Sequence, residues 1–130
     1  MVKNRKLDHL GIATSDLEKF VNWYVDVLGF EVFEECIAED GTPIKFLKNN
    51  EGVIYEVFQL ENLKPEDMNR IDHISYVSDD IEKDYEYCMS QGFKDTTGGI
   101  QTIGTAWSKG CSYFKIEGPN GEQIEFDQIL

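Results

Sequence analysis

The feature that most constrains this chain is an internal repeat. The phrase "KLDHLGIATSDLEKF" at residues 6–20 returns as "RIDHISYVSDDIEKD" at 70–84, with an offset of 64 that aligns His9 with His73. The halves also end alike, because "GVIYEVF" at 52–58 matches "GEQIEFD" at 121–127 and aligns Glu56 with Glu125. Such self-similarity predicts two copies of one supersecondary unit, neither of which can bury its apolar face alone.

Each copy is predicted to form a strand, a helix and three further strands. Residues 7–14 and 71–78 are rich in β-formers, and each runs into a capping-box pattern, Ser15 with Glu18 and Asp79 with Glu82. Two apolar stripes at helical spacing follow: Leu17, Phe20, Val21, Tyr24, Val25 and Leu28, then Ile81, Tyr85, Cys88 and Met89. Gly29 and Gly92 are typical of left-handed helix C-caps.

Turn signals separate the remaining strands. The expected strands are 30–37, 44–48 and 53–60 in the first copy, and 101–108, 111–117 and 122–129 in the second. The fold class is therefore α+β, with two βαβββ modules in a pseudo-twofold arrangement that forms an open, half-barrel-like mixed sheet with helices outside. The modules are expected at 1–60 and 71–130, joined by a polar linker at 61–70, as one compact domain. Residues 94–106 are read either as a mobile flap or as a long turn.

Alternation along the strands places the two histidines on faces with small neighbours. His9 shares its face with Gly11 and Ala13, and His73 shares its face with Ser75 and Val77. Glu56 and Glu125 lie on the corresponding faces of the closing strands, where a buried carboxylate needs a compensating charge. Two neutral imidazoles and two carboxylates balance a divalent cation, so His9, Glu56, His73 and Glu125 are predicted to bind Zn, Ni, Co, Mn or Fe.

Charge and composition exclude several function classes. The formal net charge is −13, so nucleic acid and anionic membranes are unlikely partners on electrostatic grounds. No apolar run reaches the length of a membrane helix, and the N-terminus is unlike a secretory signal, so a cytoplasmic protein is expected. The three cysteines, Cys36, Cys88 and Cys111, have no CxxC spacing and are expected to be buried, reduced thiols.

The chain resembles the vicinal oxygen chelate superfamily, which contains glyoxalases, bleomycin-resistance proteins and extradiol dioxygenases. The resemblance rests on the paired βαβββ units, on "WYVDVLGF" at 23–30 and on the terminal "GPNGEQIEF" at 118–126. It places metal ligands on the first and last strand of each module, at the same His9, Glu56, His73 and Glu125. This ligand set is most similar to bacterial glyoxalase I. The resemblance implies a lyase or isomerase that acts through an enediolate, with Glu125 as base, Glu56 as its symmetry mate and a homodimeric assembly.

One position departs from the glyoxalase I pattern. Where the glutathione-dependent enzymes carry an arginine on the first strand, this chain has Ala13, and its two arginines are Arg5 and Arg70. The residues that could replace this arginine in binding a carboxylate of the thiol are Lys45, Lys48, Lys94 and Lys109. The missing arginine counts against glutathione, so the expected substrate is a small oxo compound or its adduct with another thiol. Trp107, Tyr55 and Tyr76 are read either as pocket residues or, preferably, as core.

The alternatives are a methylmalonyl-CoA epimerase-like isomerase and a metal-free module that binds an antibiotic. The epimerase fits "LDHLGIA" at 7–13, but bases that could bind phosphate are scarce. The drug-binding members generally lack the histidine and glutamate set. An extradiol dioxygenase would need a third histidine, and a fosfomycin-type transferase would need a cationic site. Pairing of the modules within one chain or between two chains is open.

Overall fold

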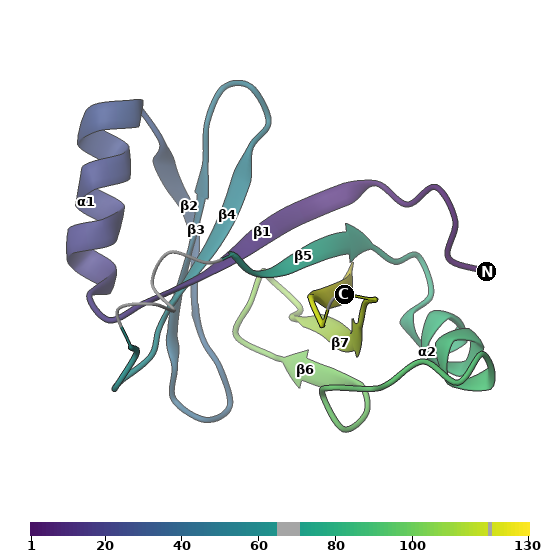
Figure 1. The fold of residues 1–130 in the computed structure, drawn as a ribbon. Coiled ribbons are helices and arrows are strands. Elements are labelled where there is room, and N and C mark those ends of the chain that lie inside the picture. The colour runs from purple at the N-terminus through teal and green to yellow at the C-terminus, as the bar shows by residue number, and fades with distance from the viewer. Residues whose placement is uncertain (65–70, 120) are drawn as a thin grey trace. The chain divides into compact units, whose positions relative to one another are not determined.

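The computed structural model describes residues 1–64, 71–119 and 121–130 and confirms an α+β chain of two βαβββ modules (Figure 1). The elements of the first module are β1 (Leu7–Thr14), α1 (Leu17–Leu28), β2 (Glu31–Ile37), β3 (Pro43–Lys48) and β4 (Ile54–Gln59). Those of the second are β5 (Ile71–Val77), α2 (Ile81–Ser90), β6 (Gln101–Ile103), β7 (Cys111–Glu117) and β8 (Gln123–Ile129). Every predicted strand is found within one residue of its expected ends, except 101–108.

The chain divides into two compact units, His9–Asp72 and Met1–Asp8 with His73–Leu130. Most of the predicted linker, residues 65–70, lies outside the described residues, and the module limits 1–60, 61–70 and 71–130 stay a prediction. None of the helices in the described part of the chain is long and apolar enough to span a membrane.

In the first unit the strands are ordered β2-β3-β4-β1, with β1 and β4 parallel and the other pairs antiparallel. Helix α1 covers one face of this sheet, and the buried core between them consists of Leu17, Val21, Phe30, Leu47 and Val57. Only part of the predicted apolar stripe of α1 is buried. Val25 and Leu28, which were predicted to belong to it, are 37% and 53% exposed.

The second unit repeats this plan in the order β5-β8-β7-β6, with β5 and β8 parallel. Helix α2 packs on one face through a core of Ile81, Cys88, Phe114, Ile116 and Phe126. Tyr76 packs against this core and Tyr55 against that of the first unit, so both tyrosines contribute to core packing, and Tyr76 also lines a cavity with Arg5 and Phe126.

The helix starts differ by one residue from the predicted caps. Asp16 caps α1 by accepting from the Lys19 backbone N–H, and Asp80 caps α2 by accepting from that of Lys83. The predicted caps Ser15 and Asp79 are wrong, because an aspartate directly follows each of them and reaches the third N–H of the helix. At the other end of α1, Gly29 is the expected left-handed C-cap, with φ of 72°.

The end of α2 follows a variant of the expected pattern. Its C-cap is Gln91, which has right-handed backbone angles, and Gly92 follows it with φ of 75°. The left-handed glycine is therefore Gly92, as predicted, although it lies one residue after the C-cap, where the chain leaves the helix in a conformation that a side chain would disfavour.

The three cysteines are free and buried, as predicted. Burial, together with the nearby carboxylates Glu56 and Glu34, raises the pKa of Cys36 to about 11. Burial, with Asp84 close by, raises the pKa of Cys88 to about 11. Because the thiolate is the reactive form, neither of these two thiols is suited to nucleophilic chemistry at neutral pH.

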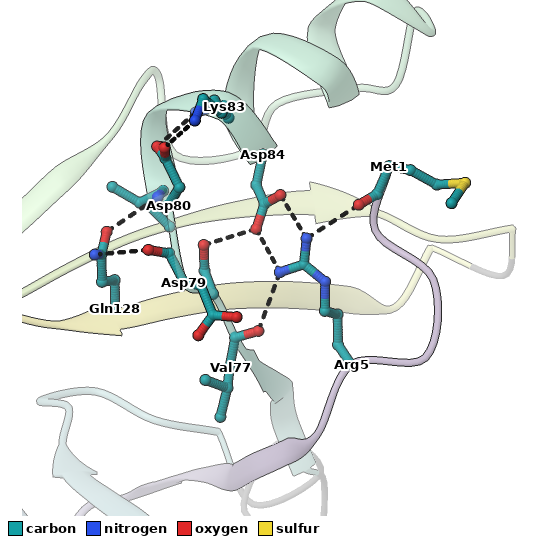
Figure 2. Close-up of polar contacts among 10 residues, drawn as sticks. Met1, Arg5, Val77, Asp79, Asp80, Lys83, Asp84 and Gln128 are labelled. Atoms are coloured by element: carbon teal, nitrogen blue, oxygen red, sulfur yellow. Dashed lines mark hydrogen bonds and ion pairs between the residues drawn. The ribbon is translucent and has the colours of Figure 1, made fainter.

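The N-terminal segment is held to the second unit by Arg5 (Figure 2). Its guanidinium donates to both carboxylate oxygens of Asp84 at 2.6 Å, and also to the backbone carbonyls of Met1 and Val77. Ser78 donates to the same carboxylate at 2.6 Å. The hydrogen bond and charge of Asp84 raise the pKa of Arg5 against the opposing effect of burial. This bidentate ion pair therefore links the N-terminal segment to the first turn of α2.

Residues 94–106 form a turn organised by one carboxylate, and the strand after it is shorter than predicted. Asp95 accepts hydrogen bonds from the Tyr85 hydroxyl and from the backbone N–H groups of Thr97, Gly98 and Gly99, at 2.7–3.0 Å. The predicted strand 101–108 ends at Ile103, because the chain turns there and Trp107 has a positive φ of 57°.

Replacing Asp95 with asparagine is expected to remove an acid-sensitive part of the stability. Burial alone would raise the pKa of Asp95, but hydrogen bonds, led by those from Tyr85 and Thr97, lower it from 3.8 to about 2. A depressed carboxyl pKa stabilises the fold above pH 4, and that contribution is lost as the pH falls from about 4 to about 2. Urea unfolding at pH 7 should show D95N destabilised by about 1–2 kcal/mol. The difference should shrink at pH 2.5, whereas Asp26→Asn on the exposed face of α1 should show neither effect.

Candidate metal centre

In the first unit, β1 and β4 bring a histidine and a glutamate together. These parallel neighbours place Gly11 opposite Glu56, so His9 lies two residues away on the same face. The distance from His9 Nε2 to Glu56 Oε2 is 3.8 Å, and the two side chains are 2% and 13% exposed. The Phe46 ring on β3 stands edge-on to the His9 ring, with 5.6 Å between centroids. The imidazole is therefore fixed between an apolar ring and a carboxylate.

The second unit repeats this pair. In the parallel ladder of β5 and β8, Ser75 lies opposite Glu125, in the relation that Gly11 has to Glu56. The distance from His73 Nε2 to Glu125 Oε2 is 3.5 Å, and both side chains are almost fully buried. The duplicated sequence thus builds the same histidine–glutamate geometry twice.

The position of the helices explains why these side chains share a face. Ile124 and Phe126 on β8, and Ile74 and Tyr76 on β5, alternate with the site residues, and all but Ile74 belong to the helix-side core. Alternation along a strand then directs His73 and Glu125 to the opposite face. Val57 and Tyr55 have the same relation to Glu56 in the first unit.

The spacing within each pair suits two ligands of one metal ion. Nε2–Oε2 separations of 3.8 and 3.5 Å exceed the usual length of an N–H···O hydrogen bond. Two nitrogen or oxygen ligands at 2.0–2.2 Å from a tetrahedral ion lie about 3.4 Å apart. Imidazole nitrogen and carboxylate oxygen are also a donor set that zinc and its first-row neighbours accept. The residues present therefore fit a divalent transition metal, and each pair supplies half of the predicted ligand set.

Three of the four lysines proposed from the sequence as anion-binding substitutes form ion pairs with exposed or partly exposed glutamates, whereas Lys109 is exposed. Lys45 pairs with Glu35, Lys48 with Glu31, and Lys94 with Glu117, each with the lysine side chain about a third or more exposed. Sequence analysis did not identify Lys115. Its Nζ lies 3.8 Å from Glu125 Oε2, and its side chain is only 16% exposed. Its place beside Glu125 depends on the register of β7 against β8, which the residue pattern alone does not supply.

Comparison with known proteins gives a family match over nearly the whole chain. A family model described as the Glyoxalase/Bleomycin resistance protein/Dioxygenase superfamily matches residues 6–126. A curated relative, the uncharacterized protein YwbC of Bacillus subtilis (strain 168), is 29% identical over 127 residues, which are 95% of this chain and 98% of the relative.

Solved structures share the fold at low sequence identity. A hypothetical protein from Bacillus halodurans C-125 has a TM-score of 0.77 at 21% identity, covering 98% of this chain and 96% of its own. Methylmalonyl-CoA epimerase from Mycobacterium tuberculosis has a TM-score of 0.77 at 21% identity, covering 100% and 93%. A variant epimerase from Streptomyces coelicolor, in complex with 2-nitronate-propionyl-CoA, has a TM-score of 0.74 at 20% identity, covering 95% and 96%.

Proposed function

Because the chain belongs to the Glyoxalase/Bleomycin resistance protein/Dioxygenase superfamily, we propose that it is a metal-dependent lyase or isomerase. Its substrate is a small oxo compound or the thiol adduct of one. The proposed ligands of one divalent metal ion are the histidine and the glutamate of each module: His9, Glu56, His73 and Glu125. The observation that carries the proposal is that both units hold a buried histidine beside a glutamate at the spacing of two metal ligands.

The proposed reaction is a proton transfer between neighbouring carbons. When bound, the metal ion supplies Lewis acidity that polarises the substrate carbonyl and acidifies the adjacent C–H. Glu125 is proposed to take that proton and return it to the neighbouring carbon, and Glu56 serves the opposite face of the substrate. The Glu125 side chain is 5% exposed and that of Glu56 is 13% exposed, and this limited access of water favours return of the proton to the substrate.

The thiol partner, if the substrate is an adduct, is proposed to be other than glutathione. Ala13 is buried and apolar at the position where the glutathione-dependent enzymes are expected to carry an arginine. A thiol without the two carboxylates of glutathione would have no need of that arginine. The expected homodimer and cytoplasmic location are part of the proposal and can be checked by sedimentation and by fractionation of the native cells.

Epimerisation of methylmalonyl-CoA is the second candidate. It is favoured by the solved epimerases, which share this fold along 95–100% of the chain. It uses the same proton chemistry, since one carboxylate removes a proton beside a carbonyl and another returns it. The scarcity of basic residues for the coenzyme phosphates argues for the smaller substrate.

We expect Glu125→Gln to lower turnover by at least about 100-fold, because general-base catalysis contributes 10²–10⁴-fold. The assay is product formation from methylglyoxal mixed with glutathione, cysteine or other small thiols. Deuterium incorporation into methylmalonyl-CoA tests the second candidate in parallel. Glu117→Gln on β7 is the matched control, because Glu117 is partly exposed, pairs with the exposed Lys94 and should be dispensable. Absence of turnover with every substrate in metal-loaded protein would leave a binding module as the better description.

A further inference from the structure

The two proposed glutamate ligands have different neighbours on the adjacent strands. In the first unit, Glu56 lies between Gly11 on β1 and Phe46 on β3. In the second, Glu125 lies between Ser75 on β5 and Lys115 on β7. The positions correspond through the repeat. The offset of 64 that aligns His73 with His9 also aligns Ser75 with Gly11, and the offset of 69 that aligns Glu125 with Glu56 also aligns Lys115 with Phe46. The duplicated sites thus differ by an added hydroxyl and an added cation, both beside Glu125.

Ser75 presents a polar atom that the described part of the protein leaves without a hydrogen-bond partner. The residue is fully buried, and its Oγ makes no hydrogen bond within residues 1–64, 71–119 and 121–130. A buried hydroxyl without a partner destabilises the fold by comparison with a satisfied one. Because the corresponding Gly11 needs no such group, the sheet does not require the hydroxyl for its own construction.

Lys115 brings a positive charge to the same face. Its Nζ is 3.8 Å from Glu125 Oε2 and 5.7 Å from the centre of the Tyr113 ring. The first distance is longer than a charged hydrogen bond, which is usually 2.7–2.9 Å. Phe46 fills the corresponding place in a sheet of the same design, so the fold does not require the lysine either. Asp127 is the remaining acid on this face of β8 and lies opposite Tyr113 rather than Lys115.

We propose that Ser75 and Lys115 bind an anionic oxygen of the substrate, and that the substrate is an oxo compound bearing a carboxylate. This inference rests on the proposed function for the place of the reacting carbonyl. Once Glu56 and Glu125 offset the two charges of the metal ion, Lys115 can offset a third negative charge, on the ligand. The buried serine donates the second hydrogen bond to the same oxygen pair.

The test uses two probes of nearly equal shape, pyruvate and its neutral analogue pyruvamide. Their dissociation constants are measured by ligand-observed NMR with purified protein of known zinc content. We expect wild type to prefer pyruvate, and Lys115→Met to weaken pyruvate binding roughly tenfold or more with little change for pyruvamide. Ser75→Ala should weaken pyruvate binding by a smaller factor. Lys94→Met removes the same charge from an exposed position and should keep the wild-type ratio.

The outcomes separate this site from the metal centre. Equal ratios in wild type and Lys115→Met, or wild-type protein without preference for pyruvate, would overturn the anion site even if zinc is bound. A preference that depends on Lys115 in protein that binds no zinc would support the anion site and count against the metal-dependent reaction. Normal zinc content with loss of the preference in Lys115→Met is the result that both proposals expect.

Discussion

His73→Ala is expected to abolish tight metal binding. His73 is one of two buried imidazoles that face a glutamate, and removing outer-shell partners of a metal ligand already costs 10–100-fold in affinity. Loss of the ligand itself should therefore weaken binding by more than about 100-fold. The measurement is zinc per chain by elemental analysis after dialysis, followed by competition with a chromogenic chelator. His9→Ala should have an effect of the same size, because the first unit repeats the geometry.

The control must separate loss of a ligand from loss of the fold. His73→Gln keeps much of the side-chain volume and should fold while still losing the metal, as circular dichroism and elemental analysis together would show. Glu117→Gln removes a partly exposed carboxylate of the same unit and should bind zinc like wild type. Equal zinc in wild type and both His73 variants would refute the ligand role.

Arg5→Met is expected to have the largest effect on stability. It would leave the Asp84 carboxylate, 7% exposed, without the guanidinium that donates two hydrogen bonds at 2.6 Å (Figure 2). Breaking a buried ion pair by removing one partner costs about 3–5 kcal/mol. Because the Arg5 side chain is 21% exposed, solvent screening reduces the expected loss to about 2–3 kcal/mol. Urea unfolding followed by circular dichroism measures the difference.

A double variant tests the reason for this loss. If the cost comes from an unpaired buried carboxylate, Arg5→Met with Asp84→Asn should be more stable than Arg5→Met alone. Lys83→Met removes the exposed pair with Asp80 and should leave the unfolding midpoint unchanged. Unfolding of Arg5→Met at the wild-type midpoint would show that Arg5 does not hold the N-terminal segment to this unit.

The repeat made much of the architecture predictable. Histidine and glutamate recur at equivalent places, and the repeat together with strand alternation predicted that Glu125 lies on the same sheet face as His73. The exact ends of helices were harder to predict, because neighbouring residues can compete for the same cap position. "SD" at 15–16 and "DD" at 79–80 each offer two possible caps, and the spacing of later acids does not decide between them. The end of β6 was also missed, since a Gly- and Thr-rich segment has no clear periodicity.

The difference in polar residues between the two modules could be recognised only from the register of the sheet. The sequence shows Ser75 near His73, but only the tertiary structure shows that the Ser75 hydroxyl has no hydrogen-bond partner among the described residues. The sequence does not single out Lys115, because a lysine between apolar strand residues is also typical of a strand at a solvent-exposed edge of a sheet. Only the pairing of β7 with β8 puts it opposite Glu125 and in the place of Phe46.

The central claim is that the two histidine–glutamate pairs share one metal ion. Anomalous diffraction at the zinc edge, from crystals of zinc-loaded protein, tests it most directly. The account predicts one anomalous peak for each pair of modules, within about 2.0–2.2 Å of a nitrogen or oxygen atom from each proposed ligand. A separate peak at each pair, or a single peak away from His9 and His73, would contradict it.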